Sequence, residues 1–217
     1  MENEKAILSI DTSDEVCGAC IFFSKEKYFS TSIRLKYSHS EKLLPIINNL
    51  ILSAEIKPQQ IESIAISEGP GSFTGLRIGM AAAKGLAYGW KIPLIPVPTF
   101  EAIALEISNF YHEGNEFVIA NKVNKDEVYL AKFQIKANSY IFVDELKILD
   151  KNHIPRRTKN RKLFGNAISD RSVRFSSPSP EFVAMWAKQF GEKKKLINFD
   201  YLEPNYLKSF IIKEKIK

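Results

Sequence analysis

The segment from Gly69 to Gly75 carries residues whose types and spacing could bind an anion. Its glycines allow positive φ angles and a close approach of the main chain, and Ser72 and Thr74 can cap a helix or donate a hydrogen bond to a phosphate. A helix expected directly after the segment would point its free N–H groups back into the loop. The spacing matches neither the phosphate-binding G-x-x-x-x-G-K-[ST] loop nor the G-x-G-x-x-G dinucleotide fingerprint. The segment is therefore either an anion-binding loop built on Gly69, Gly71 and Gly75 or a tight strand-to-helix turn that binds nothing.

A second polar segment, Asp11-Thr12-Ser13, follows the first apolar strand that the sequence predicts. A carboxylate at this place could hold a metal ion near a bound phosphate. Thr12 and Ser13 stand where a loop that wraps a phosphate would favour glycine, so a simple turn is the favoured interpretation of Asp11. The remnant of a nucleotide site is the alternative.

Other residue patterns with catalytic meaning are weak in this sequence. His39, His112 and His153 are the only histidines, and none has another four residues on, so no helix can present a histidine pair to a metal ion. The G-x-S-x-G signature of a serine nucleophile is missing. Cys17 and Cys20 form one C-x-x-C pair, but residues three apart on a strand point to opposite faces, so we expect two small buried apolar side chains.

Apolar periodicity predicts two units of related plan, each with strands followed by helical segments. The first three strands, joined by tight turns, suggest an antiparallel meander. Strands are expected at residues 5–10, 16–23, 28–34, 61–68, 94–97, 117–120, 127–134 and 141–148. Helices are expected at residues 40–54, 76–89, 99–111 and 180–190. Ser38 or Ser40 can cap the first helix and Thr99 the third.

The helix expected after the glycine loop is rich in small residues, with Gly79, Gly85 and Gly89 among alanines. Each glycine inside a helix costs about 1 kcal/mol relative to alanine, so a close approach to another helix should offset that cost. The helix at residues 40–54, with its broad apolar stripe, is the natural neighbour. The sequence leaves open whether this approach lies within the fold or across a subunit interface.

Length, composition and charge narrow the class of protein. With 217 residues and 45% hydrophobic content, the chain can bury a core. Its charged start leads straight into an apolar strand and no run of about eighteen apolar residues occurs, so we expect a cytoplasmic protein without a membrane segment. Residues 1–150 hold 15 Lys and Arg against 19 Asp and Glu, whereas residues 151–217 hold 16 against 6. The basic final third could contact RNA or could simply be solvated.

Two motifs resemble the bacterial TsaB (YeaZ) family. They are His-Ser-Glu-Lys-Leu-Leu-Pro at residues 39–45 and Gly-Pro-Gly-Ser-Phe-Thr-Gly-Leu-Arg-Ile-Gly at residues 69–79. Shorter matches lie at residues 10–13, 84–87, 127–129 and 204–208, so the resemblance is dense over residues 5–105 and patchy beyond. The chain departs from the family at Lys122-Val123-Asn124, where an Asp-Ala-Arg-like segment is usual, which leaves the role of that loop open.

The resemblance implies an actin-like (ASKHA, ribonuclease H-like) α/β fold with subdomains at residues 1–105 and 106–217, the last residues packing back on the first. It implies a non-catalytic subunit of the tRNA N6-threonylcarbamoyladenosine modification complex, binding the catalytic subunit TsaD together with the ATPase TsaE. A homodimer is expected when TsaD is absent, and a weak tRNA contact through the basic final third. The chain itself would need no metal or other cofactor, with ATP or ADP expected at most at the junction with TsaD.

The resemblance also implies that the helices at residues 40–54 and 76–89 form the docking surface. The expected docking residues belong to the apolar stripes and small residues of these helices: Leu43, Ile46, Ile47, Leu50, Leu76, Gly79, Met80, Ala83 and Gly85. Expected nucleotide or loop contacts are the polar residues and glycines of the two loops: Asp11, Thr12, Ser13, Gly69, Gly71, Ser72, Thr74 and Arg77. Two alternative functions are a glycopeptidase-like hydrolase and a stand-alone actin-like kinase or ATPase that uses Asp11 and the glycine loop.

Overall fold

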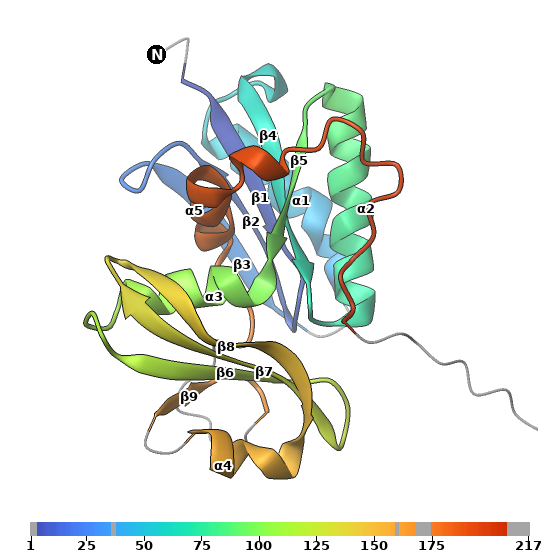
Figure 1. Cartoon of the computed structure of the whole chain (residues 1–217). Helices are drawn as coiled ribbons and strands as arrows, with labels where there is room; N and C mark the ends of the chain where they lie inside the picture. The colour runs from blue at the N-terminus through green and yellow to red at the C-terminus, as the bar shows by residue number, and fades with distance from the viewer. Residues whose placement is uncertain (1–3, 36–37, 159–160, 168–174, 208–217) are drawn as a thin grey trace, which may run out of the picture.

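The computed structural model describes residues 4–35, 38–158, 161–167 and 175–207. Two β-sheets lie one above the other in Figure 1, each accompanied by helices. Of the short motif at residues 204–208, Lys208 lies outside the described residues. No helix in the described part of the chain is long and apolar enough to cross a membrane.

The first sheet has the strand order β3-β2-β1-β4-β5. β1, β2 and β3 form an antiparallel meander, and β4 and β5 run parallel to β1. The predicted meander is confirmed, with strand ends within one residue of those expected. The strand bounds are β1 (Ala6–Asp11), β2 (Val16–Phe22), β3 (Tyr28–Arg34), β4 (Ile61–Gly69) and β5 (Leu94–Pro98).

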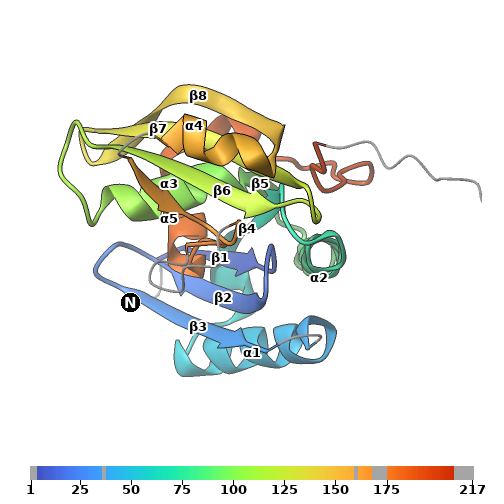
Figure 2. The same ribbon diagram turned by 90° about the horizontal axis from the view of Figure 1, so that it is seen from below.

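Helices cover both faces of this sheet. α1 (His39–Ser53) and α2 (Phe73–Trp90) pack on one face, and α5 (Pro180–Phe190) packs on the other (Figure 2). A short 3₁₀ turn, η1 (Pro58–Gln60), precedes β4. The two cysteines confirm the expected alternation: Cys17 is buried on the α1 and α2 side, Cys20 on the α5 side, and both are free thiols.

The second sheet has the order β8-β7-β6-β9 and repeats the plan of the first four strands. β6, β7 and β8 form an antiparallel meander, and β9 runs parallel to β6. The prediction of an α/β fold with two related sheets is therefore confirmed. The elements are β6 (Glu116–Lys122), β7 (Glu127–Lys136), β8 (Ser139–Asp150), η2 (Lys151–His153), α4 (Ile154–Thr158) and β9 (Lys162–Phe164).

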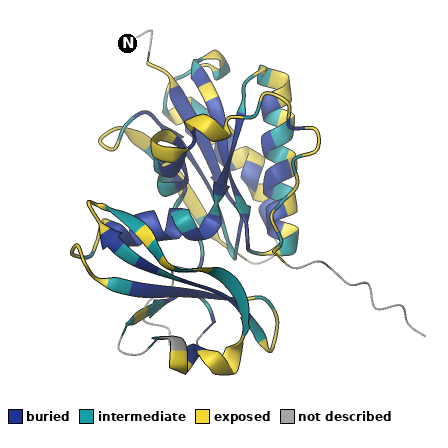
Figure 3. Ribbon diagram, in the orientation of Figure 1, coloured by how far each residue is buried: buried dark blue, intermediate teal, exposed yellow. Residues whose placement is uncertain are grey.

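α3 (Thr99–Ser108) lies between the two sheets and is buried along almost its whole length, as the dark blue ribbon of Figure 3 shows. Ala102 and Leu105 pack with α5 and the first sheet, whereas Phe100 and Ile103 pack with the second sheet. Apolar residues on both sides of a helix are typical of such a position.

Two of the predicted helix caps are wrong. Ser38 occupies the N-cap position of α1, but its hydroxyl donates to the main-chain oxygen of Leu35 and makes no capping bond. Thr99 is the first residue of α3, and its hydroxyl accepts a hydrogen bond from the N–H of Gly69. Ser38 thus bonds to the segment before α1 and Thr99 to the end of β4, and neither hydroxyl makes a capping bond to its helix.

The chain returns to the first unit after α5 and η3 (Glu192–Lys194). Residues 196–207, here called the C-terminal strap, run alongside α2 (Figure 1, red). Leu196 pairs with Leu94 of β5, and the N–H of Asn205 donates to the main-chain oxygen of Glu68 at 2.7 Å. Lys84 of α2 donates to the main-chain oxygens of Asp200 and Leu202.

Candidate functional site

The glycine loop packs directly against the turn between β1 and β2. Thr12 donates from its hydroxyl to the main-chain oxygen of Gly75 at 2.8 Å. A Cβ atom at Gly71 would overlap with Ser13, and one at Gly75 or Gly79 would overlap with Thr12. These three glycines, four residues apart, therefore form the face of the loop and helix that touches the turn, and their close approach lies within the chain.

Three of the loop's N–H groups, those of Gly69, Ser72 and Gly75, bond within the protein. The N–H of Gly69 bonds to Thr99, and that of Ser72 donates to the main-chain oxygen of Ser13 at 2.6 Å. Ser72 also caps α2, as predicted, because its hydroxyl accepts from the N–H of Gly75 at 3.3 Å. Since these groups are engaged, the geometry favours the tight-turn interpretation over an anion cradle.

Asp11 ends β1 and its side chain is fully buried. One carboxyl oxygen accepts from the Ser13 hydroxyl at 2.8 Å, and the other has no hydrogen-bond partner. Burial raises the pKa of Asp11 to about 7, and the nearby hydroxyls of Ser67 and Ser13 only partly offset that effect. The carboxyl is thus part of the core, which fits neither an exposed turn residue nor an accessible metal ligand.

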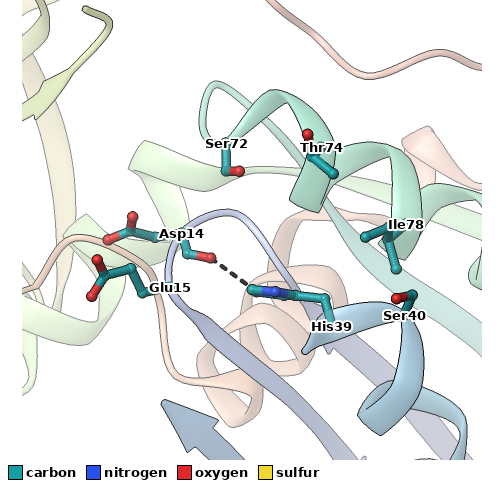
Figure 4. A pocket seen from close by; sticks show the side chains of 7 residues that line it. All are labelled: Asp14, Glu15, His39, Ser40, Ser72, Thr74 and Ile78. Carbon is teal, nitrogen blue, oxygen red and sulfur yellow. Dashed lines mark hydrogen bonds between the residues drawn. The ribbon is translucent and has the colours of Figure 1, made fainter. Parts of the chain in front are cut away.

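A cleft of about 400 Å³ lies where the β1–β2 turn meets the first turns of α1 and α2. In Figure 4, Asp14 and Glu15 lie on one side of His39, and Ser40 and Ile78 lie on the other. Ser72 and Thr74 complete the lining: Asp14, Glu15, His39, Ser40, Ser72, Thr74 and Ile78.

His39 fixes the turn beside this cleft, because its Nε2 atom lies 3.0 Å from the main-chain oxygen of Asp14 and 3.2 Å from that of Val16. Both partners are acceptors, so Nε2 donates. The carboxylate of Asp14 accepts from Asn166 at 3.3 Å, a contact between the two units. A cleft lined by two carboxylates does not favour a phosphate, and the expected nucleotide at this place stays a prediction.

The expected docking residues need a correction. Eight of the nine are buried in the chain's own core, because the apolar stripe of each helix faces the first sheet. In this fold those side chains cannot contact a partner, and only Gly85 is exposed. The buried eight are Leu43, Ile46, Ile47, Leu50, Leu76, Gly79, Met80 and Ala83.

The outward faces of the two helices carry a different set of residues. Tyr88 is 79% exposed, Leu52 66% and Leu44 52%. Ala81, Gly85 and Gly89 of α2 are exposed as well, and no atom lies within 4 Å of a Cβ built at Gly85 or Gly89. Leu44 and Leu52 lie eight residues apart and out of phase with the buried stripe. This spacing is the signal in the sequence that could have identified them as exposed leucines. Together these residues form the outward face of the two helices: Leu44, Leu52, Ala81, Gly85, Tyr88 and Gly89.

Three separate motifs of the sequence meet at Tyr206 of the strap. Its ring lies 4.9 Å from that of Phe73, and its hydroxyl accepts from Nε of Arg77 at 2.9 Å. Its main-chain oxygen accepts from the hydroxyl of Tyr129 on β7 at 3.1 Å. The strap therefore links the loop and α2 to the second sheet, a role that the sequence did not predict.

The divergent segment Lys122-Val123-Asn124 forms the turn between β6 and β7. The side-chain oxygen of Asn124 accepts from the N–H groups of Asp126 and Glu127, both at 2.9 Å. This is a side-chain turn of the kind that asparagine favours, so a local structural role accounts for the residue. In the described residues, no three His, Cys, Asp or Glu side chains come together as a metal site.

Comparison with known proteins finds relatives that are named for tRNA modification. Residues 34–179 match the family model for TsaD, tRNA N6-adenosine threonylcarbamoyltransferase. A TsaB protein of Haemophilus influenzae, named for tRNA threonylcarbamoyladenosine biosynthesis, is 31% identical over 58% of this chain and 52% of its own length. A TsaB protein of Buchnera aphidicola from Acyrthosiphon pisum is 30% identical over 76% of this chain and 75% of its own length. The match thus spans about half of the first relative and three quarters of the second.

Two solved structures share the fold. A Pseudomonas aeruginosa protein described as similar to peptidase YEAZ superposes with a TM-score of 0.77 at 21% identity, over 94% of this chain and 100% of its own. YeaZ from Pseudomonas aeruginosa superposes with a TM-score of 0.72 at 22% identity, over 88% of this chain and 95% of its own.

Proposed function

Because the chain belongs to the TsaB family, within the group covered by the TsaD family model, we propose that it is an accessory subunit of tRNA threonylcarbamoyladenosine biosynthesis. In this role it binds a TsaD-type transferase and supports it without performing the transfer itself. The cytoplasm is the expected compartment.

The observation that carries this proposal is the contrast between the two sides of α2. Towards the sheet, the glycines at 71, 75 and 79 are explained by contact with the β1–β2 turn. On the other side, a Cβ added at Gly85 or Gly89 would meet no neighbouring segment within 4 Å among the described residues, although each glycine costs helix stability. A partner helix or loop that approaches the main chain at Gly85 accounts for them.

The outward face suits a protein partner. It combines exposed leucines and a tyrosine with small residues that leave room for a close approach, and tyrosine is frequent among the residues that dominate binding energy. This surface is separate from the buried residues first expected to dock. TsaE, a homodimer of the free chain, a nucleotide at the subunit junction and a tRNA contact through residues 151–217 stay predictions.

The kinase alternative finds less support in the geometry. An ATPase that used the glycine loop would need its N–H groups for phosphate oxygens, whereas several of them bond within the chain. Asp11, the proposed carboxylate of such a site, is fully buried.

Nucleoside analysis of tRNA tests the proposed function. We expect a strain that lacks this gene to lose N6-threonylcarbamoyladenosine, and a plasmid copy to restore it, when digested tRNA is measured by mass spectrometry. The purified chain alone, given tRNA and the threonylcarbamoyl donor, should modify nothing until the TsaD-type protein is added. Unchanged modification in the deletion strain would contradict the role, and modification by the chain alone would contradict its accessory nature.

A further inference from the structure

Arg77 heads the line of exposed residues on α2. It lies four residues before Ala81 and eight before Gly85, so the three share one side of the helix, and all are exposed. Arg77 is therefore continuous with the outward face, at the end of α2 nearest the glycine loop.

The guanidinium group of Arg77 is held in place by aromatic residues. Its Cζ atom lies 4.0 Å from the ring centroid of Phe73, and its Nε atom donates to the hydroxyl of Tyr206 at 2.9 Å. Stacking and one hydrogen bond restrict a side chain that would otherwise lose much rotamer entropy on binding. The Cζ atom also lies 5.9 Å from the ring centroid of Tyr206. The rings and the one bond from Nε leave the two terminal NH₂ groups for another acceptor.

No carboxylate in the described part of the chain pairs with Arg77. Arg34 and Arg161, by contrast, have carboxylate partners in Glu15 and Glu116. A fixed guanidinium fork matches the two oxygens of a carboxylate, which it can bind through two parallel hydrogen bonds. The chain thus prepares a cation at the edge of a surface and supplies no described anion to match it.

We propose that Arg77 receives the carboxylate of an aspartate or glutamate of the TsaD-type partner and so fixes the orientation in which the outward face docks. The inference rests on the proposed function and adds the chemistry of one contact to it. Phe73 and Tyr206 act through Arg77 as positioning residues. The C-terminal strap is thereby part of the docking surface, since it carries Tyr206.

A protein carboxylate fits this place better than an RNA phosphate. Ala81 and Gly85, which follow Arg77 along the exposed line, are uncharged. Lys84, seven residues after Arg77, donates to the main-chain oxygens of Asp200 and Leu202 in the strap. RNA binding draws on several cations along a backbone, and this side of α2 does not present them. On the next side of α2, Thr74 and Ile78 border the cleft that contains Asp14 and Glu15. The cleft beside α2 therefore adds no cation that could extend a path for a phosphate backbone.

Binding of purified variants to the TsaD-type protein of the same organism, measured by calorimetry, tests the inference. We expect Arg77→Ala to weaken binding about tenfold or more, the usual effect of removing an arginine that dominates an interface. Arg77→Lys keeps the charge but loses the planar guanidinium group. Its affinity should lie between those of the unaltered chain and of Arg77→Ala. Tyr206→Phe keeps the ring and removes the acceptor, so it should weaken binding by a smaller factor, roughly two- to fivefold.

Arg156→Ala is the matched control, because Arg156 is exposed on α4 of the second unit. It should bind as the unaltered chain does, and all variants should keep the unaltered melting temperature. The loss at Arg77 should also shrink as salt is raised. Charge reversal, Arg77→Glu, should abolish binding, and reversal of one acidic residue of the partner should restore it.

The outcomes separate the inference from the function on which it rests. If the unaltered chain binds and Arg77→Ala binds equally well, the inference is overturned and the accessory role stands. If Arg77→Ala weakens binding of tRNA but not of the TsaD-type protein, the acceptor is a phosphate and the inference is again wrong. If the unaltered chain does not bind the TsaD-type protein at all, the proposed function and the inference fall together.

Discussion

At the scale of single residues, two buried carboxyl groups stand out. Burial raises the pKa of Asp11 to about 7 from 3.8, and that of Glu106 to about 7 from 4.5. The ionised form of Glu106 is better stabilised against burial, because its carboxyl oxygens accept from the N–H of Ser179 at 2.8 Å and from the Ser179 hydroxyl at 2.6 Å. Asp11 has one oxygen without a partner, so its ionised form is the less well satisfied.

The Asp11 carboxyl makes the stability of the protein depend on pH. Its folded-state pKa lies above the ordinary value, so between about pH 4 and pH 7 the native protein holds a proton that the unfolded chain releases. The contribution of Asp11 to the free energy of unfolding therefore falls as pH rises through this window and does not recover above it. Urea unfolding at pH 5 and at pH 8 measures this effect. The free energy of unfolding should decrease less from pH 5 to pH 8 in Asp11→Asn than in the unaltered chain, by on the order of 1 kcal/mol.

Asp126→Asn, at an exposed position of the β6–β7 turn, serves as the control and should keep the unaltered pH dependence. If the free energy of unfolding decreases equally from pH 5 to pH 8 in Asp11→Asn and in the unaltered chain, a raised pKa at Asp11 is contradicted.

At the scale of elements, α2 shows how one helix uses glycine in two ways. Gly75 lies against the main chain of Thr12, where even a methyl group has no room, whereas Gly85 faces open space. The two glycines are ten residues apart in one helix, so they allow a matched comparison of the same substitution.

We expect Gly75→Ala to lower the free energy of unfolding by about 2 kcal/mol or more, since the added methyl group displaces the β1–β2 turn. Gly85→Ala should be neutral or raise it by up to about 1 kcal/mol, because alanine is the better helix former. Chemical denaturation of both variants measures the difference. Similar losses at the two positions would show that Gly85 also packs within the chain.

Much of this architecture could be predicted from the sequence, because periodicity and turn residues are local signals. The meander, the glycine loop with its Ser72 cap, and the opposite faces of Cys17 and Cys20 all follow from spacing. The docking residues were placed on the wrong side, because an apolar stripe reports burial without saying whether the sheet or a partner covers it. The resemblance implied that the last residues pack on the first unit, but the contacts of the strap at Tyr206 could not be predicted, because they join residues far apart in the sequence and follow no period.

At the scale of the whole molecule, contacts on several sides tie the two units together. Tyr140 of β8 donates to Glu101 of α3 at 2.5 Å and accepts from Trp186 of α5 at 2.8 Å. Burial raises the pKa of Tyr140 above its ordinary value, so the hydroxyl keeps the proton that it donates. The strap adds the contact between Tyr206 and Tyr129. α1 and α2 are thus supported from behind by the sheet and from one side by the strap, while their outward face stays uncovered in the described structure.

The account depends most on the claim that this outward face binds the TsaD-type partner. The most direct measurement is the affinity of Gly85→Trp for that protein, beside Thr31→Trp, which adds the same side chain at an exposed position on β3. Since a Cβ at Gly85 meets no atom within 4 Å, both variants should fold and melt as the unaltered chain does. The account predicts that Gly85→Trp loses the complex while Thr31→Trp keeps it. Unaltered affinity in a folded Gly85→Trp variant would contradict it.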